Sequence, residues 1–126
     1  MIPLSQARPP SGLQLPLTLK WRQCKDMPCA MNRLQSVTMR QKVFVGGGHT
    51  YIRNGDDAHT VYEYNEVSNQ WGSLPRYNCM RFSMVILTGK LTLVGGFNTS
   101  TGEATNQVAV CEGEGMSRGW THPYPP

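Results

Sequence analysis

The residue types that could bind a metal ion gather in one polar stretch, between positions 49 and 59. Imidazole and carboxylate groups are common zinc ligands, and the stretch contains four of them: His49, Asp56, Asp57 and His59. The Asn54-Gly55 pair inside it is a strong turn signal. No regular element is predicted that would hold the four side chains around one ion. We therefore expect neither a metal site nor a cofactor.

Thiols are the second group of potentially reactive side chains. The four cysteines are Cys24, Cys29, Cys79 and Cys111. Two disulfides are possible in principle, but the chain opens M-I-P-L-S-Q-A-R-P-P, without the basic start or continuous apolar run of a secretory signal. We therefore expect a cytoplasmic chain whose thiols are reduced and buried as small apolar groups. Cys24 and Cys29 have no second ligand pair at zinc-finger spacing, so structural zinc is not expected.

Motifs and composition argue against several function classes. The sequence holds no G-x-S-x-G, no H-E-x-x-H and no P-loop, and no helical pattern follows Gly46-Gly47-Gly48-His49 as a dinucleotide fingerprint requires. The net charge of +4 comes from scattered basic residues rather than from a run, so we expect no nucleic-acid partner. No apolar run approaches the roughly 18 residues of a membrane span, so we expect no membrane partner. These observations favour a non-catalytic chain.

The elements that must position any functional residue come from a repeat with a period of about fifty residues. Arg33 and the doublet Gly47-Gly48 recur as Arg81 and the doublet Gly95-Gly96. Tryptophans recur with nearly the same period, at Trp21, Trp71 and Trp120. Glycines at the end of a strand permit positive φ and the close approach of a neighbouring backbone. The doublets therefore indicate scaffold rather than a flexible loop.

Each copy of the repeat is predicted to form four short strands. In the first copy they cover residues 34–39, 42–45, 60–65 and 70–73. In the second copy they cover residues 82–87, 91–94 and 107–111, with a short strand around Trp120. The strands of the second copy are nearly continuous apolar runs, which is typical of sheets covered on both faces.

This order of features resembles the kelch repeat: an Arg before the first strand, an apolar second strand ending in a glycine doublet, a Tyr in the third strand, and a Trp seven residues after that Tyr. The first copy has all of these residues: Arg33, Gly47, Gly48, Tyr64 and Trp71. The second copy has Arg81, Gly95, Gly96 and Trp120, with Gly113 in place of the Tyr. The resemblance covers about residues 17–123 and makes Trp21 the end of a preceding copy.

The resemblance implies an all-β fold, namely a partial kelch-type β-propeller with two four-stranded antiparallel blades and one extra outer strand. The implied organisation is an irregular leader at 1–16, an outer strand of a preceding or closing blade at 17–24, a first blade at 31–75 and a second blade at 79–123. Structural roles are implied for Gly47, Gly48, Tyr64, Trp71, Gly95, Gly96, Trp120 and Trp21. Each blade buries its apolar faces only against its neighbours. We therefore expect packing against further blades or self-association.

The resemblance also implies a protein-interaction module, which recruits substrates for ubiquitination or serves as a cytoskeletal scaffold. The alternative is a piece of a kelch-like propeller enzyme whose catalytic or metal site lies on other blades. Arg33 and Arg81 either bind a partner's carboxylate at one mouth of the channel or tie adjacent blades together through carbonyls. The loops after the glycine doublets either carry recognition or are solvated connections. The residues predicted to contact a partner are Arg33, Arg81, His49, Tyr51, Arg53, Phe97 and Asn98.

Overall fold

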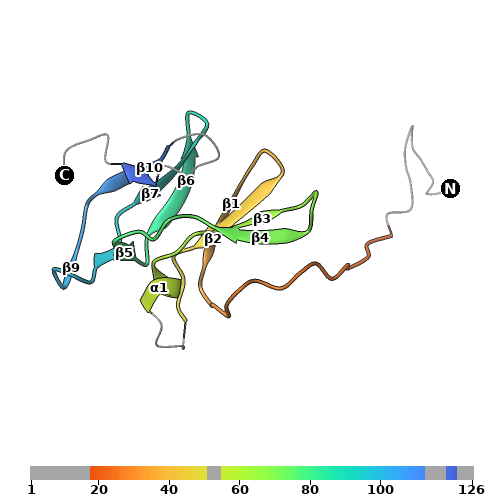
Figure 1. Ribbon diagram of the computed structural model, residues 1–126, viewed down its shortest axis with the longest axis horizontal. Coiled ribbons are helices and arrows are strands. Elements are labelled where there is room, and N and C mark those ends of the chain that lie inside the picture. The colour runs from red at the N-terminus through yellow and green to blue at the C-terminus, as the bar shows by residue number, and fades with distance from the viewer. Residues whose placement is uncertain (1–17, 51–54, 113–118, 122–126) are drawn as a thin grey trace.

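The computed structural model describes residues 18–50, 55–112 and 119–121, and antiparallel strands dominate this part of the chain. The strands form two four-stranded sheets and one three-stranded sheet (Figure 1). The predicted all-β fold with four-stranded antiparallel sheets is therefore confirmed. Among the described residues, no helix is long and apolar enough to cross a membrane.

The first sheet places its strands in chain order. They are β1 (Gln35–Met39), β2 (Lys42–Gly46), β3 (Tyr62–Asn65) and β4 (Gln70–Ser73). Arg40 and Gln41 join β1 to β2 with φ angles of 54° and 64°, as a tight hairpin turn with two left-handed residues requires. The connection from β2 to β3 contains the helix α1 (Gly55–Ala58). The polar sequence there favours exposure, but Ala58 and His59 at the end of the connection are only 5% and 2% exposed.

The second sheet repeats this arrangement. Its strands are β6 (Ser83–Leu87), β7 (Lys90–Val94), β10 (Val108–Cys111) and β11 (Trp120–Thr121), in the order β11-β10-β7-β6. Thr88 and Gly89 form the β6–β7 turn with φ angles of 48° and 74°. The three-stranded sheet consists of β5 (Cys79–Met80), β8 (Phe97–Asn98) and β9 (Glu103–Ala104). The connection after Gly96 thus forms an antiparallel hairpin.

The main core lies where β1 of the first sheet packs beside β6 of the second. Side chains alternate between the two faces of a strand, so Met84 of β6 and Leu91 and Leu93 of β7 all point into this core. The buried cluster is Phe44, Val61, Leu74, Tyr77, Cys79, Phe82, Met84, Leu91, Leu93, Ala109 and Cys111. Burial of each large apolar side chain contributes about 1.5–3 kcal/mol, so the cluster fastens the two sheets to each other.

The segment before the first sheet is anchored near β4. The backbone N–H of Lys25 donates to Asn69 Oδ1 at 3.0 Å, and the Lys25 carbonyl accepts a hydrogen bond from Trp71 Nε1 at 2.7 Å. Residues 18–24 form no strand with any described residue, and Trp21 is 100% exposed. The outer strand expected at 17–24 would pair with another blade, so it stays a prediction.

Candidate functional site

Two arginines occupy equivalent places in the two repeats. Arg33 follows a short antiparallel bridge that ends on His49, and Arg81 follows the β5–β8 pairing that ends on Phe97. Both arginines are exposed, with positive φ angles of 54° and 55°. Such backbone costs a non-glycine residue about 1–2 kcal/mol, so the pairing beside each arginine must hold it in place. Neither arginine forms a hydrogen bond or ion pair with another residue that the structure describes.

The second glycine of each doublet makes this arrangement possible. A Cβ on Gly48 would lie 2.6 Å from the backbone oxygen of Asn32, and one on Gly96 would lie 2.7 Å from the backbone oxygen of Met80. Only glycine therefore allows the two backbones to approach. The chain that leaves each doublet is thereby placed directly beside the segment that carries the arginine.

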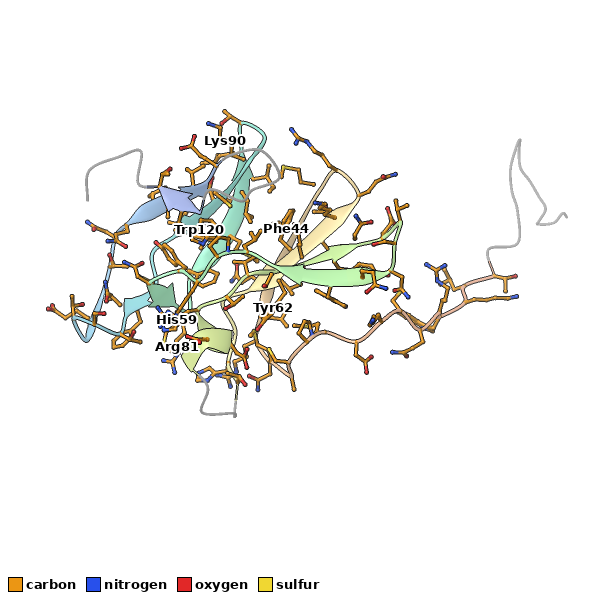
Figure 2. The ribbon with its side chains drawn as sticks, viewed as in Figure 1. Phe44, His59, Tyr62, Arg81, Lys90 and Trp120 are labelled. Atoms are coloured by element: carbon orange, nitrogen blue, oxygen red, sulfur yellow. The ribbon has the colours of Figure 1, made fainter. Side chains whose placement is uncertain are left out.

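We refer to the residues at these equivalent places in the two repeats as the arginine edge. The arginine edge consists of Arg33, His49, Arg81 and Phe97. In the view of Figure 2, Arg81 and Lys90 lie toward opposite ends of the molecule. His49 is half-buried and Phe97 is 37% exposed. The arginine edge therefore combines positive charge and hydrogen-bond donors with an accessible aromatic ring.

Three further residues predicted to contact a partner have different outcomes. Tyr51 and Arg53 lie outside the described residues. Asn98 Oδ1 accepts hydrogen bonds from the backbone N–H groups of Ser100 and Thr101 at 2.9 and 3.3 Å. The oxygen of Asn98 therefore holds the β8–β9 turn, and a partner contact through its amide N–H group stays a prediction.

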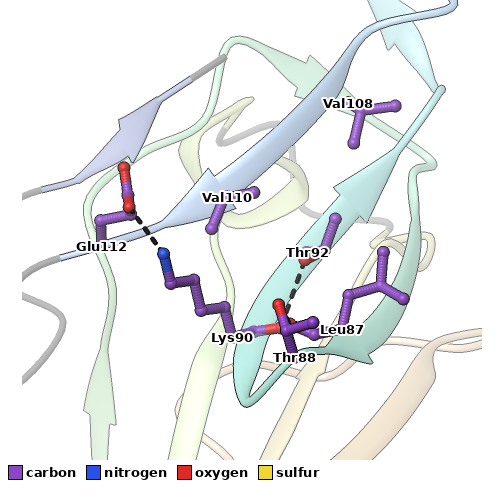
Figure 3. A pocket seen from close by; sticks show the side chains of 7 residues that line it. All are labelled: Leu87, Thr88, Lys90, Thr92, Val108, Val110 and Glu112. Atoms are coloured by element: carbon purple, nitrogen blue, oxygen red, sulfur yellow. Dashed lines mark hydrogen bonds and ion pairs between the residues drawn. The ribbon is translucent and has the colours of Figure 1, made fainter. Parts of the chain in front are cut away.

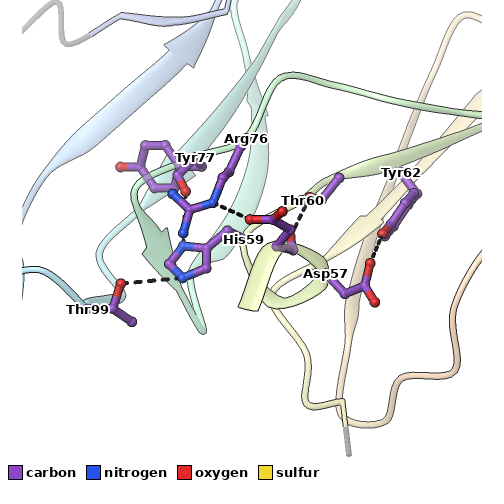
Figure 4. Close-up of polar contacts among 8 residues, drawn as sticks. Asp57, His59, Thr60, Tyr62, Arg76, Tyr77 and Thr99 are labelled. Atoms are coloured by element: carbon purple, nitrogen blue, oxygen red, sulfur yellow. Dashed lines mark hydrogen bonds and ion pairs between the residues drawn. The ribbon is translucent and has the colours of Figure 1, made fainter. Parts of the chain in front are cut away.

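His59 joins three elements in one polar network (Figure 4). Its Nδ1 lies 3.0 Å from the backbone carbonyl of Tyr77, and the Tyr77 N–H donates to the His59 carbonyl at 2.9 Å. Its Nε2 lies 3.5 Å from Oγ1 of Thr99, in the β8–β9 hairpin. Burial lowers the pKa of His59, and the positive charge of Arg76 lowers it further. A neutral imidazole thus links the end of α1, the segment between the sheets and the hairpin.

The two aspartates of the possible metal cluster have other partners. Arg76 Nε donates to Asp56 Oδ1 at 2.9 Å, and Tyr62 Oη donates to Asp57 Oδ1 at 2.6 Å (Figure 4). Burial, and then the bond to Asp57, raise the pKa of Tyr62. In the described ranges, no three His, Cys, Asp or Glu side chains are placed to share a metal ion. The aspartates instead tie α1 to neighbouring segments, a role that sequence reasoning missed because an isolated Arg76 carries no pattern.

Each of the two later tryptophans binds the segment that leads into its sheet. Trp71 Nε1 donates to the Lys25 carbonyl at 2.7 Å, and Trp120 Nε1 donates to the Pro75 carbonyl at 2.9 Å. The Trp120 ring also packs edge-on against Tyr77, with ring centroids 5.5 Å apart. The sequence suggests packing between blades but not these acceptors. The sequence did offer a signal for these acceptors, because Lys25 and Pro75 precede Trp71 and Trp120 by nearly the same number of residues.

The four cysteines are free. Cys79 and Cys111 are buried, as expected, and burial raises the pKa of both thiols, that of Cys111 to about 11. Cys24 is exposed and Cys29 only partly buried, so the expected burial is wrong for these two. Both lie in the segment before the first sheet, which no second sheet covers within the described part of the chain.

Comparison with known proteins adds one relative. No family model matches the sequence. Kelch-like protein 6 of Homo sapiens is 33% identical to it over 64 residues. The similarity is to a kelch-type protein. It spans 49% of this chain and 9% of that protein, so the chain corresponds to a small part of its relative. The comparison supports a kelch-type repeat.

Proposed function

We propose that this chain is a non-catalytic protein-interaction module of the kelch type, whose arginine edge binds an acidic segment of a partner protein. The observation that carries the proposal is the repeated placement of Arg33 and Arg81, both exposed and both in the same left-handed conformation. Similarity to a Kelch-like protein supports a binding role of this kind.

The chemistry of the two arginines suits a carboxylate. A guanidinium group presents a planar fork of donors that matches a carboxylate in two parallel hydrogen bonds. The second sheet packs directly against the first, yet no hydrogen bond joins Arg33 to it among the described residues. The same backbone strain is kept at both places, as is typical of positions that hold a side chain ready for function. Binding therefore explains these arginines better than a bond between sheets.

Phe97 adds an apolar contact to the proposed surface. Its ring is 37% exposed, while its backbone is held in β8 by pairing with Met80 and Ala104. An aromatic side chain on a rigid strand gains contact area at low cost in conformational entropy. The partner segment that fits is therefore one in which apolar side chains accompany the carboxylates.

The test compares arginine variants of the full chain in quantitative capture of partner proteins. Arg33→Ala and Arg81→Ala remove the proposed contacts. Arg40→Ala is the matched control, because Arg40 is also exposed and has a φ of 54°, but follows β1 instead of preceding it. Since hydrogen bonds to charged groups contribute about 1.5–3 kcal/mol, the first two variants should bind the same partner at least about tenfold more weakly.

The melting temperatures of the three variants separate binding from folding. We expect them to be alike, because the three changes affect equally exposed side chains at similar backbone conformations. If every partner is recovered equally by all three variants, the arginine edge is not the binding surface.

The cellular role that we propose for this binding is cytoplasmic, either the recruitment of substrates for ubiquitination or scaffolding at the cytoskeleton. The general similarity to a Kelch-like protein supports a binding role but does not choose between these two. Mass spectrometry of the proteins lost on Arg81→Ala and kept on Arg40→Ala would distinguish a ubiquitination substrate from a cytoskeletal component.

A further inference from the structure

The outward face of the second sheet is apolar and accessible. In β6, Met84 points into the core, while the alternate side chains of Val85 and Leu87 are 37% and 51% exposed. We call this surface the open face; its accessible residues are Val85, Leu87, Val94 and Val108, and they surround the buried side chains of Thr92 and Val110. Figure 3 shows part of it around a hollow, beside the ion pair of Lys90 with Glu112 at 3.0 Å. Because the pair balances its own charges, the surface is close to neutral.

The equivalent face of the first sheet is covered by the second sheet. Val37 and Met39 occupy the repeat positions of Val85 and Leu87, and both are half-buried against the core between the sheets. One type of surface therefore occurs twice in this chain, once covered and once open. The covered copy shows what kind of surface fits the open one: another four-stranded sheet.

The surroundings of Gly47 and Gly95 show the same difference between the covered face of the first sheet and the open face of the second. A Cβ on Gly47 would collide with the backbone oxygen of Phe82, at the start of the second sheet. Gly95 has the same type of backbone, with a φ of 67° against 73°, but its nearest atom would be the Thr105 oxygen at 3.5 Å. No described residue takes the place beside Gly95 that Phe82 takes beside Gly47, so the second sheet is built to receive a neighbour.

The matching surface is present on the first sheet. Its outer face carries the cross-strand row Thr38, Val43 and Tyr64. Thr38 and Val43 occupy the repeat positions of Ile86 and Leu91, which pack in the existing interface between the two sheets. The segment that leads into the first sheet is also held as its counterpart is, by a tryptophan that bonds to a backbone carbonyl. The chain thus carries both halves of the interface that it already uses once.

We propose that the open face binds the outer face of the first sheet in a second copy of this chain, so that copies join head to tail. Each copy supplies one open face and one outer face. Further copies can therefore add to both ends until the assembly closes on itself. Rings of about four to eight sheets are usual for blades of this type. The proposal goes beyond the binding function and uses a different face.

The test measures the mass of the full-length chain in solution by light scattering across a range of concentrations. Leu87→Glu places a carboxylate on the open face, and Thr38→Glu places one on the opposite outer face. Val67→Glu is the control, because Val67 is 74% exposed in the β3–β4 turn, away from both faces. An unpaired carboxylate resists burial, so each of the first two variants should weaken association at least about tenfold, and the control should behave as wild type.

Mixing the two variants gives the decisive result. Leu87→Glu keeps an intact outer face and Thr38→Glu keeps an intact open face, so the mixture should form a one-to-one pair and nothing larger. Far-UV circular dichroism of each variant shows whether it is folded. A wild-type chain that is monomeric at every concentration would overturn the proposal. So would a dimer that resists Thr38→Glu, since that dimer would use one face twice, or a mixture that fails to pair although both variants are folded.

Discussion

Replacing Gly47 by alanine measures how closely the two sheets approach. Gly47 has a φ of 73°, and a Cβ there would collide with the backbone oxygen of Phe82. The left-handed backbone alone costs an alanine about 1–2 kcal/mol. Because a backbone atom cannot swing aside as the end of a side chain can, relieving the collision costs about 1–3 kcal/mol more. We therefore expect Gly47→Ala to lower the free energy of unfolding by about 2–5 kcal/mol.

Gly95→Ala is the matched control for this prediction. Its φ is 67°, and the nearest atom to its Cβ would be the Thr105 oxygen at an ordinary 3.5 Å. It should therefore lose only the backbone contribution, about 1–2 kcal/mol. Urea unfolding at one low protein concentration compares the midpoints and slopes of the two variants. Equal losses would refute the reasoning, since they would mean that backbone conformation alone, and not the approach of the second sheet, requires glycine at position 47.

Three further predictions follow from single contacts. The native pKa of His59 lies below its ordinary 6.5, so the unfolded state binds more protons; stability should be complete above about pH 6.5 and decline as the pH falls toward the native pKa. Urea midpoints from about pH 7.5 to 5 should show this decline, and His59→Gln should flatten it; a profile unchanged by the substitution would contradict the assignment. Trp71→Phe removes the hydrogen bond to the Lys25 carbonyl and should cost about 0.5–1.5 kcal/mol in chemical denaturation; a stability equal to wild type would count against the anchoring role of the indole. Native alkylation at about pH 8, followed by mass spectrometry, should label exposed Cys24 long before Cys111, whose burial raises its thiol pKa to about 11; equal labelling would show that the core opens readily.

The strands of both sheets could be predicted because their signals are local. Alternating or continuous apolar residues, interrupted by short turns, specify a strand without reference to the rest of the chain. The turns at Arg40-Gln41 and Thr88-Gly89 lie where the sequence predicts them. The glycine doublets could be recognised as scaffold because they recur with the period of the strands. The arginines at equivalent places could be found in the same way, although their partner could not.

The remaining features could not be predicted because they depend on contacts between distant parts of the chain. His59 sits in a polar stretch that favours exposure, yet it is buried because Tyr77 and Thr99 approach it from other elements. Asn98 lies in a polar segment of the kind that often carries recognition, yet its side-chain oxygen accepts a hydrogen bond that holds the β8–β9 turn. Burial of one residue is decided by which other residues pack over it, and a sequence pattern records only the neighbours along the chain.

The sequence by itself determined the repeat, the strand order and the positions that must be glycine, since these depend on periodicity and backbone sterics. Only the tertiary structure decided which face of each sheet is covered. Val85 and Leu87 look like core residues in the sequence, but they are 37% and 51% exposed because the existing interface uses the opposite face of β6. An apolar residue in the sequence indicates only that burial of its side chain is favourable. The packing of the two sheets shows which of the apolar faces is buried and which is left exposed.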